Sequence, residues 1–174
     1  MEWLSKRGMA MKTRQETVTI RFSEMKDAVS LMELDELVWD CNTAPEPLKW
    51  TSRDHYLLQC PPGTQLVALY EEELCGYVGF RAPTGLHSNR HVLELNIAVH
   101  PSHQRRGIGK RLIEAVKEMA RVEGITKLRL RVLSSNPGAL SFYKNCGFKE
   151  EGRLIQEFYV DGRYVDDILM CYFL

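Results

Sequence analysis

The sequence lacks any long run of hydrophobic residues. No stretch approaches the roughly 20 apolar residues that a membrane-spanning helix needs, and the polar start, residues 1–15, has no apolar signal-peptide segment. We therefore expect a cytoplasmic protein with no membrane partner. The first 16 residues are basic and poor in apolar side chains, so we expect a flexible tail over 1–16 and a single domain over 17–174.

The sequence also lacks paired cysteines and a net charge. Its five cysteines are scattered and never spaced as C-x-x-C, which argues against a disulfide framework and a zinc site, so we expect no metal. The 23 basic and 23 acidic residues cancel. Because a general nucleic-acid binder carries an overall basic field, we expect no nucleic-acid partner. Any anion site must then be local.

What is present is a clear alternation of strand and helix patterns, typical of a mixed α/β fold. Strands are predicted at Val18–Phe22, Gln65–Tyr70, Cys75–Phe80, His91–His100, Lys127–Leu133, Phe148–Val160 and Arg163–Phe173. Helices are predicted over 23–39, with Ser23 as the N-cap, and over 52–60, 108–122 and 137–146. The strand, helix, strand order around residues 91–133 predicts a parallel crossover.

The helix at 108–122 has the clearest apolar face, and the last two strands have the clearest turn. The spacing of five residues predicts a single buried stripe: Ile108, Leu112, Ala115, Met119 and Val122. Asp161-Gly162 is a strong two-residue hairpin signal between the last strands.

A basic, glycine-containing segment precedes this helix. Residues 103–111 hold two glycines, four Arg or Lys residues and no acid. Gly107 and Gly109 let the backbone approach a ligand closely, and a helix that begins there presents unpaired N–H groups. A diphosphate fits such a segment, although a solvated basic turn is the alternative. Neither a P-loop nor a dinucleotide fingerprint is present, because Arg111 follows Lys110 and a third glycine is missing.

Two sequence blocks carry a family resemblance. The first is a loop with Gln104, Gly107 and Gly109, and the second contains Asn136, Ala139, Tyr143 and Gly147-Phe148. With these blocks in order, residues 18–174 resemble the GNAT superfamily of acyl-CoA-dependent N-acetyltransferases, most densely from 91 to 148. The resemblance implies a mixed β-sheet of about seven strands flanked by about four helices, with splayed central parallel strands.

The resemblance also implies an activity. A GNAT enzyme moves an acetyl group from acetyl-CoA, its acyl-donor substrate, to a primary amine by direct attack in a ternary complex, with no metal. The acceptor is left open as a small-molecule, peptide or protein amine, and a homodimer is one assembly that the sequence allows. A non-catalytic acyl-CoA-binding regulatory module is the alternative function.

Residue roles follow from the resemblance, position by position. The backbone of Ile97, Ala98 and Val99 would pair with the pantetheine arm, and Asn136 would bond the same arm. Tyr143 would be the general acid near the thioester sulfur, with a core aromatic as its alternative. The loop residues would hold the diphosphate: Gln104, Arg105, Arg106, Gly107, Ile108, Gly109 and Lys110.

The general base is less clearly marked. Glu94 shares one strand face with Asn96 and Ala98, so it is a candidate base acting directly or through water. A cross-strand partner for an arginine is the equal alternative. Ribosomal-protein N-terminal acetyltransferases, a similar subgroup, carry a glutamate base five residues before the Asn, where this chain has Arg131. That cation argues against their substrate and favours an acceptor with a carboxylate or phosphate.

Acceptor choice in the family usually lies with the first helices and the terminal hairpin. In this chain those regions contain Trp39, Asp40, Glu46 and Trp50, and Phe158, Tyr159 and Tyr164. For each of these residues, packing is as good an explanation as recognition.

Overall fold

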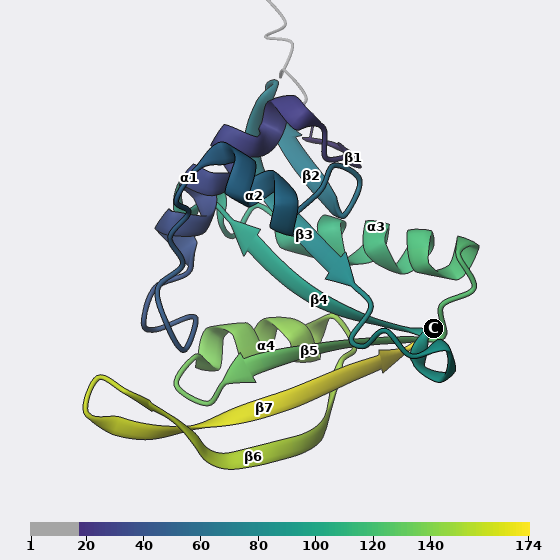
Figure 1. Ribbon diagram of the computed structural model, residues 1–174. Helices are drawn as coiled ribbons and strands as arrows, with labels where there is room; N and C mark the ends of the chain where they lie inside the picture. Colours follow the sequence, from purple (N-terminus) through teal and green to yellow (C-terminus); the bar gives the residue numbers. More distant parts are fainter. Residues whose placement is uncertain (1–17) are drawn as a thin grey trace, which may run out of the picture.

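The computed structural model describes residues 18–174 (Figure 1), so the predicted tail over 1–16 lies outside the described residues. The strands are β1 (Val18–Phe22), β2 (Gln65–Tyr70), β3 (Glu73–Arg81), β4 (Val92–Val99), β5 (Lys127–Leu133), β6 (Lys149–Val160) and β7 (Arg163–Phe173). The α-helices are α1 (Ala28–Val38), α2 (Arg53–Gln59), α3 (Ile108–Val122) and α4 (Pro137–Asn145). Their order along the chain is the predicted one.

All seven strands form one sheet in the order β1-β2-β3-β4-β5-β7-β6. Every neighbouring pair is antiparallel except β4 and β5, which α3 connects as the predicted parallel crossover. The parallel pairing covers only Val92–Glu94 against Lys127–Arg129. Beyond these residues β4 remains paired only with β3, and β5 only with β7, so the two central strands diverge (Figure 1).

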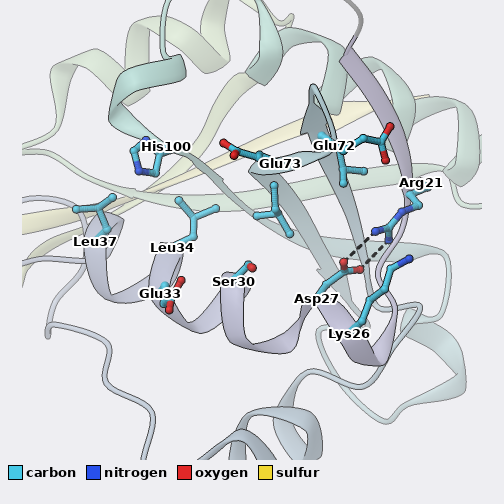
Figure 2. Close-up of a pocket in the computed structure, with 12 residues that line it drawn as sticks. Arg21, Lys26, Asp27, Ser30, Glu33, Leu34, Leu37, Glu72, Glu73 and His100 are labelled. Atoms are coloured by element: carbon cyan, nitrogen blue, oxygen red, sulfur yellow. Dashed lines mark hydrogen bonds and ion pairs between the residues drawn. The ribbon is translucent and has the colours of Figure 1, made fainter.

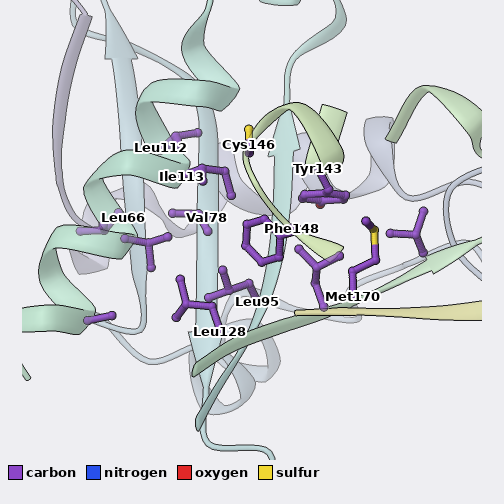
Figure 3. Close-up of a cluster of buried hydrophobic side chains, with 14 of the residues drawn as sticks. Leu66, Val78, Leu95, Leu112, Ile113, Leu128, Tyr143, Cys146, Phe148 and Met170 are labelled. Atoms are coloured by element: carbon purple, nitrogen blue, oxygen red, sulfur yellow. The ribbon is translucent and has the colours of Figure 1, made fainter. Parts of the chain in front are cut away.

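Each face of the sheet carries its own hydrophobic cluster. Because side chains alternate along a strand, Leu66 and Val78 join the cluster under α3, whereas Val67 and Tyr77 join the cluster under α1 and α2. Figure 3 shows the first cluster, where Phe148 lies among side chains from α3, from α4 and from the strands. The two clusters hold helices on both sides of the divergence between β4 and β5.

The buried face of α3 differs from the predicted stripe. The buried apolar residues are Ile108, Leu112, Ile113, Val116 and Ala120, whereas Val122 is 78% exposed. The predicted 4-3-4-3 spacing repeats every 3.5 residues, and an α-helix drifts by about 20° per heptad from that repeat. Val122 lies two heptads beyond Ile108 and has therefore rotated out of the interface.

The prediction that Ser23 caps the first helix is wrong. The chain first makes a 3-10 turn over Met25–Asp27, where the Asp27 carboxylate accepts the Glu24 N–H at 2.7 Å. The Ser23 hydroxyl instead accepts the N–H of Gly63 at 3.2 Å. The Ser23 side chain, which the local pattern assigned to the helix, is thus used in a tertiary contact with the turn before β2.

The β6–β7 hairpin follows the sequence signal. Asp161 and Gly162 have φ values of 48° and 77°. Positive φ at both central residues is what a type I′ turn requires, and it matches the twist of the flanking strands.

Candidate functional site

A cavity of about 940 Å³ lies where β4 and β5 diverge. Its lining comes from β4 and β5, from the end of β3, from the loop before α3 and the start of α3, from α4, and from the α1–α2 connection. All the predicted site residues line it except Ala98 and Arg106. Segments distant in the sequence thus meet in one space at the point where β4 and β5 separate.

The loop before α3 presents backbone N–H groups to this cavity. Gly107 has a φ of 78° and Arg105 a φ of 61°, both left-handed. The first bond into the helix runs from the Arg111 N–H to the Gly107 carbonyl at 3.1 Å. The N–H groups of Ile108, Gly109 and Lys110 precede that bond and so have no acceptor within the helix. Unpaired N–H groups and the positive end of the helix dipole are the two features that favour an anion at a helix N-terminus.

The two glycines of the loop meet different surroundings. A Cβ on Gly107 would meet nothing within 4 Å, whereas a Cβ on Gly109 would lie 3.0 Å from Cζ of Phe142. The side chain of Gln104 ties the loop to the end of β4, since its Nε2 donates to the Val99 carbonyl at 3.2 Å. The loop therefore has a fixed position relative to the open edge of β4.

Two predicted residues lie outside the cavity lining. The Ala98 side chain is buried in the cluster under α1, and its backbone is registered with Tyr77 of β3. The Arg106 guanidinium lies over the ring of Tyr70, 5.4 Å from its centroid. Neither residue is therefore placed at the cavity by its side chain.

Helix α4 contributes Asn136 and Tyr143. Asn136 caps the helix, because its Oδ1 accepts the Ala139 N–H at 3.1 Å. Tyr143 is 6% exposed and packs against Phe142 and Phe148, yet it also lines the cavity. Its hydroxyl forms no hydrogen bond to any of residues 18–174, and burial raises its pKa above the ordinary value. Tyr143 is thus both a core aromatic and a protonated phenol at the cavity wall.

Glu94 is held by two arginines on neighbouring strands. Its Oε1 accepts Nη2 of Arg81 at 2.6 Å, and its Oε2 accepts Nη2 of Arg129 at 2.7 Å. Burial by itself raises the pKa of Glu94, but the hydrogen bonds and charges of the two arginines outweigh it and keep the pKa below its ordinary value. The geometry is that of a cross-strand ion pair with both oxygens engaged.

Arg131 also lines the cavity and forms an ion pair with Asp167. Its Nε donates to Oδ2 of Asp167 at 2.5 Å, and Asp167 is buried. This hydrogen bond raises the pKa of Arg131. Among the cavity-lining residues in the described chain, Glu94 carries the only carboxyl group, beside four arginine or lysine side chains.

Several lining residues were not predicted as site residues. Phe142 closes on Gly109, and Arg81 reaches Glu94 from β3. Residues 43–45 contribute from the α1–α2 connection, where the sequence showed only a break containing prolines. Asn96 had a signal, since it shares a strand face with Glu94. Of the candidate tryptophans, Trp39 lines the cavity and Trp50 does not.

A second cavity, of about 670 Å³, lies between α1 and the β2–β3 turn (Figure 2). It holds the ion pair in which Arg21 donates to Asp27 at 2.7 and 2.9 Å. None of the predicted site residues lines it. The predicted site residues that line a cavity therefore all line the one between β4 and β5.

The described residues hold neither a membrane-spanning helix nor a metal-binding cluster. No helix within residues 18–174 is long and apolar enough to span a bilayer. Over the same range, no three His, Cys, Asp or Glu side chains are grouped so that they could hold a metal ion.

Comparison with curated proteins gives relatives with two different acceptors. A spermidine N(1)-acetyltransferase of Vibrio cholerae is 38% identical over 74 residues, which is 42% of this chain and 43% of that protein. A ribosomal protein bS18-alanine N-acetyltransferase of Escherichia coli is 38% identical over 77 residues, 43% of this chain and 51% of that protein. The alignments thus span only about half the length of these relatives.

Solved structures match over nearly the whole chain. smu.2055 from Streptococcus mutans has a TM-score of 0.82 and 30% identity, covering 89% of this chain and 98% of that one. The structure of yncA from Salmonella typhimurium, described as a putative acetyltransferase with its cofactor acetyl-CoA, has a TM-score of 0.79 and 23% identity. It covers 91% of this chain and 94% of that one. Finally, the sequence matches the acetyltransferase (GNAT) family over residues 31–148, so this chain belongs to that family.

Proposed function

We propose that this protein transfers an acetyl group from acetyl-CoA to a primary amine by direct attack in a ternary complex. The observation that carries the proposal is the divergence of β4 and β5, which opens a cavity of about 940 Å³ beside the N-terminus of α3. An acyl donor with a diphosphate and a long amide-containing arm fits both features.

The donor would lie along the open edge of β4. Beyond Glu94 this edge has no partner on β5, so the backbone groups of Ile97 and Val99 that face it are available to the amides of the arm, whereas those of Ala98 face Tyr77 of β3. The diphosphate would take the N–H groups of residues 105–110 at the start of α3. The side-chain NH₂ of Asn136 would reach the arm from α4, since only its oxygen is used in the cap.

The chemistry requires a neutral amine. A lysine-like amine has a pKa near 10.4, so freeing its lone pair at pH 7 costs about 5 kcal/mol. The nitrogen then attacks the thioester carbon, a C–N bond forms, and the C–S bond breaks. The amine gives up one proton and the leaving sulfur gains one, so the protons balance without a metal or a covalent enzyme intermediate.

Tyr143 is our candidate for the acid that assists the leaving sulfur. Its raised pKa keeps the phenol protonated, so it offers an O–H to the developing thiolate. A free thiol has a pKa near 8.5, below that of this phenol, so Tyr143 contributes a hydrogen bond in the transition state and keeps its proton. The proton that ends on sulfur comes from the nitrogen of the adduct. The proton that the protonated amine must lose before it attacks leaves through Glu94 or through a water path. The lowered pKa of Glu94 and its two arginine partners favour water.

The acceptor, we propose, is an amine that also carries a carboxylate or phosphate. Arg81 and Arg131 line the cavity, where Arg81 bonds to Glu94 and Arg131 to Asp167. Glu94, the single carboxyl group among the described lining residues, is already bonded to two arginines. A polyamine such as spermidine, the substrate named for one relative, would find no free carboxylate there. A panel of an amino acid, a phosphorylated amine, spermidine and a peptide, each assayed for thiol release from acetyl-CoA, tests this order of preference.

The donor site has a test that does not need the acceptor. Gly107 and Gly124 both have positive φ, 78° and 71°, and a Cβ on either would meet nothing within 4 Å. Alanine at either position therefore costs about the same backbone strain, of order 1 kcal/mol. Only Gly107 lies in the loop, so calorimetry should find weaker acetyl-CoA binding for Gly107→Ala and parent-like binding for Gly124→Ala. Equal binding by both variants would contradict the proposed diphosphate site.

The alternative, a non-catalytic acyl-CoA-binding module, predicts a different pair of results. It would bind acetyl-CoA with the same dependence on Gly107 but release no thiol with any amine of the panel. Binding together with turnover supports the enzyme.

A further inference from the structure

The carboxyl group of Asp35 is buried beside Trp39, a residue of the cavity lining. Asp35 lies on α1, is 2% exposed, and accepts three hydrogen bonds. Oδ1 accepts the Tyr77 hydroxyl at 2.5 Å and Nε1 of Trp39 at 3.2 Å, and Oδ2 accepts Nε1 of Trp50 at 2.9 Å. Within residues 18–174, no Arg or Lys bonds to it. A buried carboxyl with neutral partners alone is costly unless its bonds are kept.

Tyr77 extends this group to the cavity wall. Its hydroxyl accepts Nε1 of Trp39 at 2.9 Å and Nδ2 of Asn96 at 3.3 Å while it donates to Asp35. A phenol has one proton and two lone pairs, so this hydroxyl is saturated. Indole and carboxamide N–H groups do not release protons near neutral pH. The chain of bonds therefore cannot relay a proton, and its effect is to hold its members in place.

Two of these members line the cavity, and a third controls the connection that closes it. Trp39 and Asn96 are part of the lining, together with residues 43–45. Trp50 lies at the far end of the same α1–α2 connection, packed on Tyr56 with 4.8 Å between ring centroids. The Leu48 N–H also donates to the Trp39 carbonyl at 3.0 Å. Both ends of the connection are thus tied to one carboxyl group.

The arrangement places this wall on the side of the sheet opposite the donor loop. Asp35 lies on α1, Trp39 directly follows α1, and Tyr77 lies on the sheet face that α1 covers. Helices α3 and α4 pack on the other face of the sheet. An amine that approaches a donor held by the α3 loop would therefore meet the Trp39 and Asn96 wall.

We propose that Asp35 is a positioning residue for the acceptor: by holding Trp39, Trp50 and, through Tyr77, Asn96, it keeps the acceptor wall in one arrangement before the amine arrives. This proposal rests on the proposed function. It assigns Asp35 no contact with substrate and no proton transfer. Its consequence is that acceptor affinity depends on a carboxyl group outside the cavity lining, while donor affinity does not.

The main experiment compares Asp35→Asn with Asp27→Asn, using the full chain. Asp27 is also buried, directly before α1, and its carboxylate accepts hydrogen bonds from Arg21 and from a backbone N–H. It does not line the cavity between β4 and β5. An asparagine at 35 keeps the volume and loses one of the two acceptor oxygens. Because the freed wall must be ordered when the amine binds, we expect the acceptor KM of Asp35→Asn to rise about tenfold.

Other readouts separate positioning from general damage. The kcat of Asp35→Asn at saturating acceptor and its Kd for acetyl-CoA should stay within about twofold of the parent. Asp27→Asn should lose thermal stability and leave the acceptor KM unchanged. Equal KM values for Asp35→Asn and the parent, or equal KM increases in both variants, would overturn the proposal.

A second variant covers the case in which Asp35→Asn does not fold. Trp50→Phe keeps an aromatic ring on Tyr56, removes one donor to Asp35, and changes no lining residue. It should also raise the acceptor KM, and a parent-like KM would count against the positioning role of Asp35.

The proposed function and the positioning role of Asp35 also fail differently. A parent that binds acetyl-CoA but acetylates no amine refutes both, whereas an active parent with an unaffected Asp35→Asn refutes only the positioning role.

Discussion

Replacing Tyr143 by phenylalanine isolates one oxygen at the cavity wall. The hydroxyl has no hydrogen-bond partner within residues 18–174, and the ring packs against Phe142 and Phe148 with centroids 5.2 and 5.8 Å away. Phenylalanine keeps this packing, so the free energy of unfolding should change little. If the hydroxyl donates a hydrogen bond to the leaving sulfur, kcat should fall by about 10²–10³. That range corresponds to about 3–4 kcal/mol of transition-state stabilisation.

The assay follows thiol release from acetyl-CoA at saturating acceptor, beside a thermal melt of each variant. Tyr56→Phe is the matched control. Tyr56 is also buried, but its hydroxyl donates to Oε1 of Gln65 at 3.0 Å, and Tyr56 does not line the cavity between β4 and β5. Losing that bond should cost about 1 kcal/mol of stability and leave kcat unchanged. A folded Tyr143→Phe enzyme with a parent-like kcat would refute the role of Tyr143 in catalysis.

Three further predictions concern stability and selectivity. The hydrogen bond from Arg21 lowers the pKa of Asp27; its stabilisation is therefore present above pH ~4, the ordinary carboxyl pKa, and is lost as pH falls through the lower folded value. Urea unfolding between pH 3 and 7 should show a smaller acid loss in Asp27→Asn, and an identical pH profile would contradict this. Leu112→Ala leaves a cavity at a fully buried site and should lower the free energy of unfolding, measured in urea, by about 2–5 kcal/mol. A loss under about 1 kcal/mol would contradict tight packing around Leu112. Arg131→Lys keeps the charge but loses the planar guanidinium, so the kcat/KM preference for a carboxylate-bearing over a neutral amine should fall about tenfold, and an unchanged preference would remove Arg131 from acceptor recognition.

Much of the fold could be read from the sequence because its signals are local. Alternation, helical spacing and turn residues each depend on a few neighbouring positions. They were enough to predict the order of all the strands and α-helices, the Asp161-Gly162 hairpin and the start of α3 at the glycine loop. The capping role of Ser23 failed for the complementary reason, since Ser23 bonds to Gly63, forty residues away.

The site itself depended on the tertiary structure. The sequence by itself determined that residues 105–110 could present N–H groups to an anion, because that property needs only a glycine-containing loop and a helix start. Only the fold decided that β4 and β5 part after three paired residues, that Glu94 is shared by arginines from two neighbouring strands, and that Asp35 holds the tryptophans at both ends of the α1–α2 connection. Each of these joins residues distant in the chain, and such pairings follow from strand register and packing, which no local pattern contains.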